Sequence, residues 1–398
     1  MNVGRMVVES STVTGNADGG IRNDGTLSVE NSTLSDNSAF QGGSISNLGT
    51  LTVQNSTISG NTAIFGGGIL IGGTLTTSST ATVQNSTLDS NSALYGGSIY
   101  ASTNGELTVE DSTIFGNSAL YGGGIDNFGT LTIQNSTVSS NSATHSGAGI
   151  ITGNSLIIQT STLSDNIAGT EGGAIFSGGG GTVSVQNSTL SGNSAADGGG
   201  AISNGNSATL TVQNSIVAGQ TAGGDCTNTA ILVSNGYNIE SATSCGFTSA
   251  GDQQNVSSAS LNLSPLASNG GPTQTMALYD PSVAIDQIPV GVNGCEPGIS
   301  IDQRGAPRAG GTPTTGGSAC DVGAYEYASM PTAVTMASLD AQGASPASGL
   351  SVWDALAAAA IGAAAALGIR RRSHTDLQLF SEAHTPRCGP PYRVRPGI

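Results

Sequence analysis

The sequence predicts an all-β fold, a right-handed parallel β-helix solenoid of about eight or nine coils. The first observation is a recurring phrase, typically Asn-Ser-Thr followed by an aliphatic residue, which returns every 21 to 30 residues. The second is alternation of aliphatic and polar residues, and the third is the placement of Gly and Asn between the alternating segments. The threonine of the phrase stands at Thr12, Thr33, Thr57, Thr87, Thr113, Thr137, Thr162 and Thr189.

Each repeat contains three short alternating segments, for example residues 124–126, 131–133 and 136–139. A period of two places Leu131 and Ile133 on one face of a strand and Thr132 on the other. No segment has aliphatic residues at helical spacing over a useful length. We therefore expect three strands and three turns per coil, with Leu, Ile and Val inside and Thr, Ser and Gln facing solvent.

Two slots of the repeat are held by asparagine, which suits turns and can stack in hydrogen-bonded columns. One slot contains Asn31, Asn55, Asn85, Asn135, Asn187 and Asn214. The other begins at Asn16 and continues through the expected structural ladder of Asn37, Asn61, Asn91, Asn117, Asn141, Asn166 and Asn193. Glycine pairs such as Gly42-Gly43 permit the tight corners between strands.

Four residues after the second asparagine slot, several repeats carry a ring, at Phe65, Tyr95, Tyr121 and His145. Other repeats interrupt this column with Gln41, Thr170 and Asp197. We expect a packing column at a corner of the solenoid. The alternative is an aromatic stripe on which sugar rings stack.

Positive charge is almost absent from the repeats. The chain contains no lysine, no arginine lies between Arg22 and Arg304, and the formal net charge is −16. Such a surface repels phosphate backbones and anionic polysaccharides. We therefore expect no nucleic-acid partner, whereas glycans or other cell-surface components stay open as partners.

The cysteines indicate an oxidising compartment. Cys226 and Cys245 form one local pair and Cys295 and Cys320 another, with no CxxC motif and no nearby His. Two disulfides are expected, and the alternative is four free thiols. We expect no metal site and no cofactor. Residues 1–9 lack the apolar segment of a signal peptide, so we interpret the start as truncated, the alternative being a leaderless cytosolic protein.

Two regions resemble known bacterial surface families. Over residues 9 to 217, the Gly-Gly-Ile and Ser-x-Asn-Ser-Ala elements resemble the repeats of polymorphic outer membrane proteins. Residues 218–327 resemble the choice-of-anchor Q domain, through motifs that include Ser-Asn-Gly-Tyr-Asn-Ile at 234–239, Ser-Asn-Gly-Gly-Pro-Thr-Gln-Thr at 268–275, Asp-Gln-Arg-Gly-Ala-Pro-Arg at 302–308 and Cys-Asp-Val-Gly-Ala-Tyr-Glu at 320–326. The resemblance implies a surface protein whose C-terminal part precedes an anchoring signal, and it implies no enzymatic residues.

The region 218–327 is expected to cap the solenoid of residues 1–217, because an open end exposes apolar core and strand edges. Its two cations, Arg304 and Arg308, are expected to form local ion pairs with neighbouring acids, and the alternative is an anionic ligand.

The remaining residues indicate attachment to an envelope. Residues 328–350 have the composition of a linker, and residues 373–398 form a polar tail that we expect to be disordered. Between them, residues 351–372 form a short apolar segment that ends in Arg370, Arg371 and Arg372. This pattern predicts a C-terminal membrane-anchoring helix with a basic stop, although it is short for a span. The alternatives are a processed sorting signal and a peripheral helix.

No catalytic constellation is visible in the sequence. The acids of the repeats are scattered, and the neighbours Glu110 and Asp111 should point to opposite sides of a strand. We expect a non-catalytic, extracellular or cell-surface protein that serves adhesion or surface display. One alternative is a carbohydrate-active β-helix enzyme that acts on a neutral glycan. Another is an ice-binding protein that uses the threonine column.

Overall fold

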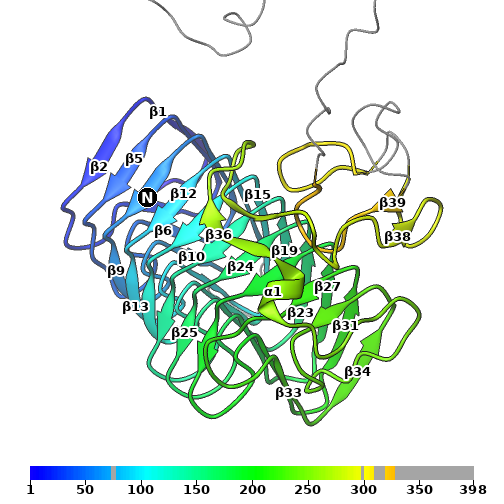
Figure 1. Ribbon diagram of the computed structural model, residues 1–398. Coiled ribbons are helices and arrows are strands. Elements are labelled where there is room, and N and C mark those ends of the chain that lie inside the picture. The colour runs from blue at the N-terminus through cyan, green and yellow to red at the C-terminus, as the bar shows by residue number, and fades with distance from the viewer. Residues whose placement is uncertain (73–77, 297–299, 309–318, 328–398) are drawn as a thin grey trace, which may run out of the picture. The chain divides into compact units, whose positions relative to one another are not determined.

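In the computed structural model, which describes residues 1–72, 78–296, 300–308 and 319–327, the chain winds into a right-handed parallel β-helix of about nine turns (Figure 1). Four parallel sheets run along it, numbered here in the order in which the chain passes through them in each coil. Sheet 1 contains β1 (Arg5–Glu9), β4 (Thr26–Glu30), β7 (Thr50–Gln54), β11 (Ser79–Gln84), β15 (Gly105–Glu110), β19 (Thr130–Gln134), β23 (Ser155–Gln159), β27 (Thr182–Gln186), β31 (Thr209–Gln213) and β34 (Ile231–Ser234). Sheet 2 contains β2 (Thr12–Thr14), β5 (Thr33–Ser35), β8 (Thr57–Ser59), β12 (Thr87–Asp89), β16 (Thr113–Phe115), β20 (Thr137–Ser139), β24 (Thr162–Ser164), β28 (Thr189–Ser191), β32 (Ile216–Val217) and β35 (Ile239–Glu240).

Sheet 3 is short and consists of β9 (Thr62–Phe65), β13 (Ser92–Tyr95), β17 (Ser118–Tyr121), β21 (Ser142–Ala143), β25 (Ile167–Ala168) and β29 (Ser194–Ala195). Sheet 4 closes the coil with β3 (Ile21–Asn23), β6 (Ile45–Asn47), β10 (Ile69–Ile71), β14 (Ile99–Ala101), β18 (Ile125–Asn127), β22 (Ile150–Thr152), β26 (Ile175–Ser177), β30 (Ile202–Asn204) and β33 (Cys226–Asn228). The expectation of three strands per coil is therefore wrong where sheet 3 is present. Its strands have only two to four residues, too few for alternation to be recognised in the sequence.

The repeated phrase is in register from coil to coil. Thr33 pairs with Thr12 on one side and Thr57 on the other, and the same pairing continues to Thr189 and Ile216. Aliphatic residues consequently stack in buried columns. In sheet 4 the inward column is Ile45, Ile69, Ile99, Ile125, Ile150, Ile175 and Ile202, each completely buried. Burying one such side chain contributes roughly 2 kcal/mol before entropy is subtracted, so the columns are the main favourable term of the fold.

The asparagines of the expected structural ladder lie inside the coil, between sheets 2 and 3, and are almost fully buried. Asn117 shows the arrangement. Its Oδ1 accepts from the backbone N–H of Asn91 at 2.9 Å and from the Asn91 amide at 3.0 Å. Its own amide donates to Leu88 O at 3.1 Å and to Asn141 Oδ1 at 2.9 Å. Each asparagine thus satisfies backbone groups that a buried corner would otherwise leave without partners.

The other asparagine slot serves the turns and does not form a hydrogen-bonded column along the solenoid. Asn31, Asn55, Asn85, Asn135, Asn187 and Asn214 have φ between 47° and 52°. Asparagine is favoured there because it tolerates the left-handed region, and only Asn187 and Asn214 share a side-chain hydrogen bond among the described residues. The serine that follows was expected to face solvent, but it is buried. In this serine column, Ser112 N donates to Ser136 Oγ at 3.1 Å, as its equivalents do along the solenoid.

The solenoid continues one coil beyond the predicted boundary at residue 217, because β33, β34 and β35 add to sheets 4, 1 and 2. The Cys226–Cys245 disulfide then joins this coil to the segment that closes the end, where Phe247 is buried against the core. Of the region predicted to be a cap, residues 218–327, only the first part closes the end of the solenoid. A second disulfide, Cys295–Cys320, lies further along the chain.

The rest of the C-terminal region folds back along sheet 2 instead of covering the end (Figure 1). This docking arm contains the one-turn helix α1 (Ser258–Leu261), the antiparallel pair β36 (Leu263–Ala267) and β37 (Thr275–Leu278), and the pair β38 (Ile288–Pro289) and β39 (Ala319–Cys320). Gln303 fixes the arm to the solenoid. Its amide donates to Thr137 Oγ1 at 3.0 Å and to Ser136 O at 3.2 Å, and its Oε1 accepts from Thr162 Oγ1 at 2.6 Å.

Replacing Gln303 by leucine should loosen the docking arm, because leucine keeps the volume but removes the hydrogen bonds to Ser136, Thr137 and Thr162 and leaves the buried Thr162 hydroxyl without a partner. An orphaned group of this kind costs about 1–3 kcal/mol. We expect amide hydrogen exchange over residues 263–278 to accelerate at least tenfold while the core strands keep their protection. Gln287→Leu is the control, since Gln287 is exposed. Unchanged exchange in Gln303→Leu would show that the arm is held by other contacts.

The predicted linker, the apolar segment with Arg370, Arg371 and Arg372, and the polar tail lie outside the described residues. Within the described ranges, no helix has the length and apolar character needed to cross a bilayer.

Candidate functional site

A step in the solenoid surface opens a cavity at the N-terminal coils. Eight positions separate Asn37 from Ile45, but only five separate Asn16 from Ile21 in the coil before. The first corner is therefore three residues shorter, and it supplies no strand to sheet 3. The ring of Phe40 in the second coil consequently has no equivalent beside it in the first coil and is 67% exposed.

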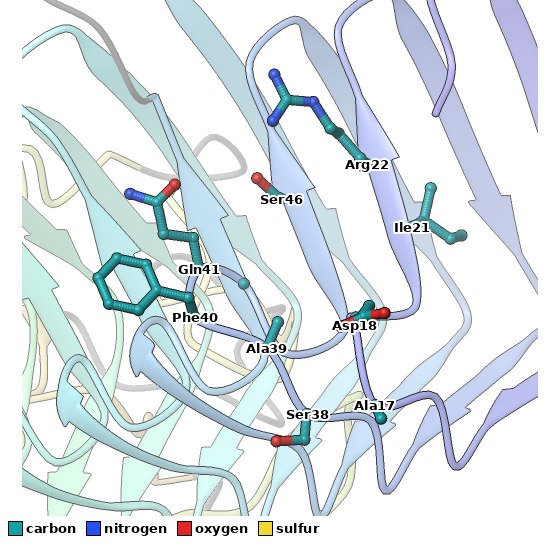
Figure 2. Close-up of a pocket in the computed structure, with 11 residues that line it drawn as sticks. Ala17, Asp18, Ile21, Arg22, Ser38, Ala39, Phe40, Gln41 and Ser46 are labelled. Atoms are coloured by element: carbon teal, nitrogen blue, oxygen red, sulfur yellow. The ribbon is translucent and has the colours of Figure 1, made fainter.

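The cavity at this step has a volume of about 360 Å³ and combines one aromatic ring with polar groups (Figure 2). Arg22 and Ser46 project outward from neighbouring strands of sheet 4, since their positions alternate with the inward isoleucines. Asp18 comes from the short corner and Gln41 from the long one. Arg22 Nε lies 3.1 Å from Asp24 Oδ1, which holds the guanidinium at the rim of the cavity.

Beyond Phe40 the rings continue along the corner as a stacked column. Phe65 and Tyr95 are 5.2 Å apart between centroids, Tyr95 and Tyr121 5.8 Å, and Tyr121 and His145 4.9 Å, with interplanar angles of 6° to 14°. The rings present most of their faces to one another and mainly their edges to solvent. This geometry is that of the packing column expected from the sequence. Phe40, which meets Phe65 edge-on at 6.0 Å, is the exposed ring at its end.

The outward column of sheet 4 is also aromatic in its middle. The centroid of the Tyr100 ring lies 5.2 Å from that of Phe65 and 6.0 Å from that of Phe128, and Phe176 lies three coils beyond Tyr100 in the column. Seven of the nine aromatic residues in residues 1–240 gather on this corner and the adjoining face, namely Phe40, Phe65, Tyr95, Tyr100, Tyr121, Phe128 and Phe176. This corner and the adjoining face therefore carry most of the aromatic side chains of the described solenoid.

Asp126 stands in the same outward column, between Tyr100 and Ile151 in register. Its side chain is only 1% exposed, and Oδ1 has no hydrogen-bond partner among the described residues. Burial raises the pKa of Asp126 to about 7. The pKa of Tyr100 is also raised, mainly by its own burial and secondly by the nearby Asp126 carboxylate.

The threonine column, on which the ice-binding alternative depends, is exposed to solvent over only about half of its length. Thr137 and Thr162 are buried under Gln303 and Gln274 of the docking arm, and Thr189 Oγ1 accepts from Ala324 N at 3.0 Å. The exposed part is therefore confined to the first five coils. Such a short array is poorly suited to a flat, regular hydroxyl surface.

The two arginines of the docking arm are occupied within the protein. Arg304 binds Asp302 at 2.6 Å and lies 3.7 Å above the ring of Tyr325. Arg308 donates to the carbonyls of Gly323 and Asp321, and burial together with the Asp321 charge raises the pKa of nearby Glu326. Arg304 therefore forms the local ion pair expected from the sequence, whereas Arg308 is held chiefly by carbonyls, with Glu326 Oε2 4.0 Å from its Nε. Both guanidiniums are occupied within the described residues.

Sequence reasoning did not identify Asp18, Arg22, Phe40 or Asp126. The spacing of 21 residues between Thr12 and Thr33, against 24 for the next repeat, is the signal that could have located the cavity. Asp126 had no such signal, because an acid in an outward strand position is expected to be solvated.

Comparison with known proteins supports the fold. A family described as "Right handed beta helix region" matches residues 1–130 of the 398. No curated protein and no solved structure matches the chain. The matched residues include the cavity, and the coils that follow, through Glu240, extend the same sheets, so the chain is a right-handed parallel β-helix repeat protein whose first third is similar to that family.

Proposed function

We propose that this chain is a non-catalytic, extracellular β-helix protein that binds neutral oligosaccharides at the cavity beside Phe40. The observation that carries the proposal is the pairing of a largely exposed ring with hydroxyl, amide, guanidinium and carboxylate groups in one open cavity. Sugar sites combine an apolar face, against which the C–H side of a pyranose packs, with a few convergent polar groups that hold its hydroxyls.

Charge favours a neutral ligand. Asp24 pairs with Arg22, Asp18 adds a further carboxylate to the cavity lining, and the chain as a whole carries −16. An anionic polysaccharide would be repelled along the rod, whereas neutral hydroxyls can use both the carboxylate and the guanidinium as partners. The resemblance of residues 218–327 to choice-of-anchor Q domains supports display at a cell surface, with residues 351–372 as the anchor. Adhesion would then come from many copies acting together.

Binding is favoured over catalysis because Asp18 is the only carboxylate among the residues that line the cavity. Glycoside hydrolysis requires two carboxyl groups that face each other about 5 to 10 Å apart. A single acid can orient a hydroxyl but cannot divide the roles of acid and nucleophile.

We expect Phe40→Ala to weaken oligosaccharide binding at least tenfold, because it removes the platform and leaves the polar groups in place. The measurement is a screen of neutral glycans followed by calorimetric titration of the best ligand. Tyr279→Ala is the matched control, since Tyr279 is 54% exposed on the docking arm, and it should bind normally. Reducing ends should not appear on prolonged incubation. Equal affinities of the two variants, or release of reducing ends, would refute the proposal.

A further inference from the structure

A second cavity lies on sheet 2, where the docking arm ends and the uncovered part of the threonine column begins. Its volume is about 380 Å³, and we call it the arm pocket. Strands β12 and β16 of the solenoid form one side, and the turn between β36 and β37 of the docking arm forms the other. The lining residues are Thr87, Thr113, Phe115, Ser268, Gly271, Pro272, Thr273 and Gln274. Two parts of the chain that are far apart in sequence therefore build one cavity.

The turn that forms the arm side of this pocket is fixed to the solenoid by hydrogen bonds. Thr137 Oγ1 donates to Gln274 O at 2.6 Å. Thr273 Oγ1 donates to Asn135 O at 3.0 Å. The Gln303 amide nitrogen lies 2.9 Å from Thr273 Oγ1 and 3.1 Å from Gln274 O. The arm side of the pocket is therefore formed before a ligand binds.

The lining combines one aromatic ring with uncharged polar groups. Phe115 is 41% exposed, so part of its ring is available to a ligand. Thr87 and Thr113 are half-buried, and Ser268 and Gln274 are exposed. Hydroxyl and amide groups supply both donors and acceptors, as a sugar requires for its hydroxyls. All eight described residues of the lining are uncharged.

This composition favours a neutral sugar over an anionic or a purely apolar ligand. An anion would find no cationic partner in the lining, and Asp89, which pairs with Phe115 in register, would repel it. A purely apolar ligand would cover the polar side chains without offering them partners. A pyranose instead packs its C–H face on a ring and presents hydroxyls around its edge.

We propose that the arm pocket is a second binding site for neutral oligosaccharides, so that one chain can hold two glycans. The inference rests on the proposed function, because it assigns the same class of ligand to a second place in the fold. The arm pocket should be the weaker site. Its hydrogen bonds join uncharged groups, whereas the cavity beside Phe40 also offers Arg22 and Asp18. Two sites on one chain would allow a single copy to cross-link glycans.

The test uses the full chain with Phe40→Ala, which removes the first site. Neutral glycans are screened against this variant, and the best ligand is titrated by saturation-transfer NMR. We expect saturable binding with a Kd on the order of 1 mM. Adding Phe115→Ala should weaken this binding at least tenfold, because the ring on which the sugar packs is lost. Adding Tyr279→Ala, which removes another exposed ring of the docking arm, should leave it unchanged.

Two further substitutions in the Phe40→Ala background separate the hydroxyl from the docking of the arm. Thr113→Val keeps the β-branched shape and removes one hydroxyl, so binding should become roughly threefold to tenfold weaker. Gln303→Leu should also weaken it, because the arm side of the pocket is loosened. In the otherwise wild-type chain, Gln303→Leu should leave the tighter site beside Phe40 unchanged. Thr113→Val decides the question if Phe115→Ala fails to fold.

The possible results separate this inference from the proposed function. Tight binding by the wild type and none by Phe40→Ala would overturn the inference and leave the proposed function standing. Binding that persists in Phe40→Ala but is unaffected by both Phe115→Ala and Thr113→Val would also overturn it. Equal binding by the wild type and Phe40→Ala, lost in Phe115→Ala, would support the arm pocket and refute the first site. Absence of glycan binding by the wild type would refute both.

Discussion

Replacing Asn117 by alanine should lower the free energy of unfolding by about 4 kcal/mol. The side chain is completely buried and makes hydrogen bonds to the coils on both sides. Alanine removes them together and leaves the Asn91 N–H and the Leu88 carbonyl buried without these partners. The loss should appear as a lower denaturation midpoint and as faster hydrogen exchange in the coils next to the substitution, because solenoid repeats stabilise mainly their neighbours.

Two further asparagine variants serve as controls, because neither removes a buried side chain of the asparagine ladder. Asn154→Ala, at an exposed position, should change stability by less than about 0.5 kcal/mol. Asn135→Gly should be nearly neutral, since Asn135 has φ of 50° and glycine adopts that conformation freely. If Asn117→Ala were as mild as these variants, the buried amides would not be a principal source of stability.

Asp126 should make the wild-type protein less stable at pH 8 than at pH 4.5, by about 3 kcal/mol from this group. Its pKa is about 7 in the folded protein, above the ordinary value of 3.8. The folded state therefore holds the proton more tightly than the unfolded chain. The resulting stability is fully present below the unfolded pKa and is lost as pH rises towards 7.

The measurement is the free energy of unfolding of wild type and Asp126→Asn at both pH values. Asparagine cannot ionise, so the variant should lose less stability than wild type between pH 4.5 and pH 8. Glu326 and Asp321 also have raised pKa values, but they are present in both proteins and cancel in the comparison. Asp197→Asn, at an exposed site, should follow the wild type. Parallel pH profiles for wild type and Asp126→Asn would show that Asp126 is solvated in solution.

The local pattern of the sequence was sufficient to predict the solenoid. A parallel β-helix stacks each coil directly on the next, so the repeat in sequence becomes the contact in space, as between Thr33 and Thr57. The inward isoleucines and the asparagine ladder could be predicted for the same reason. Sheet 3 could not, because strands such as Ser142–Ala143 are shorter than one period of alternation.

The tertiary structure alone decided where the irregular parts lie. The docking arm reaches back more than a hundred residues to place Gln303 on Thr137 and Thr162, and no periodicity encodes such a contact. Burial of Asp126 depends on what its neighbours in the adjacent coils are, not on its own segment. Repetition therefore determined the scaffold. The step at Phe40, the burial of Asp126 and the covered half of the threonine column arise from departures from that repetition, and their effects exist only once the coils are stacked.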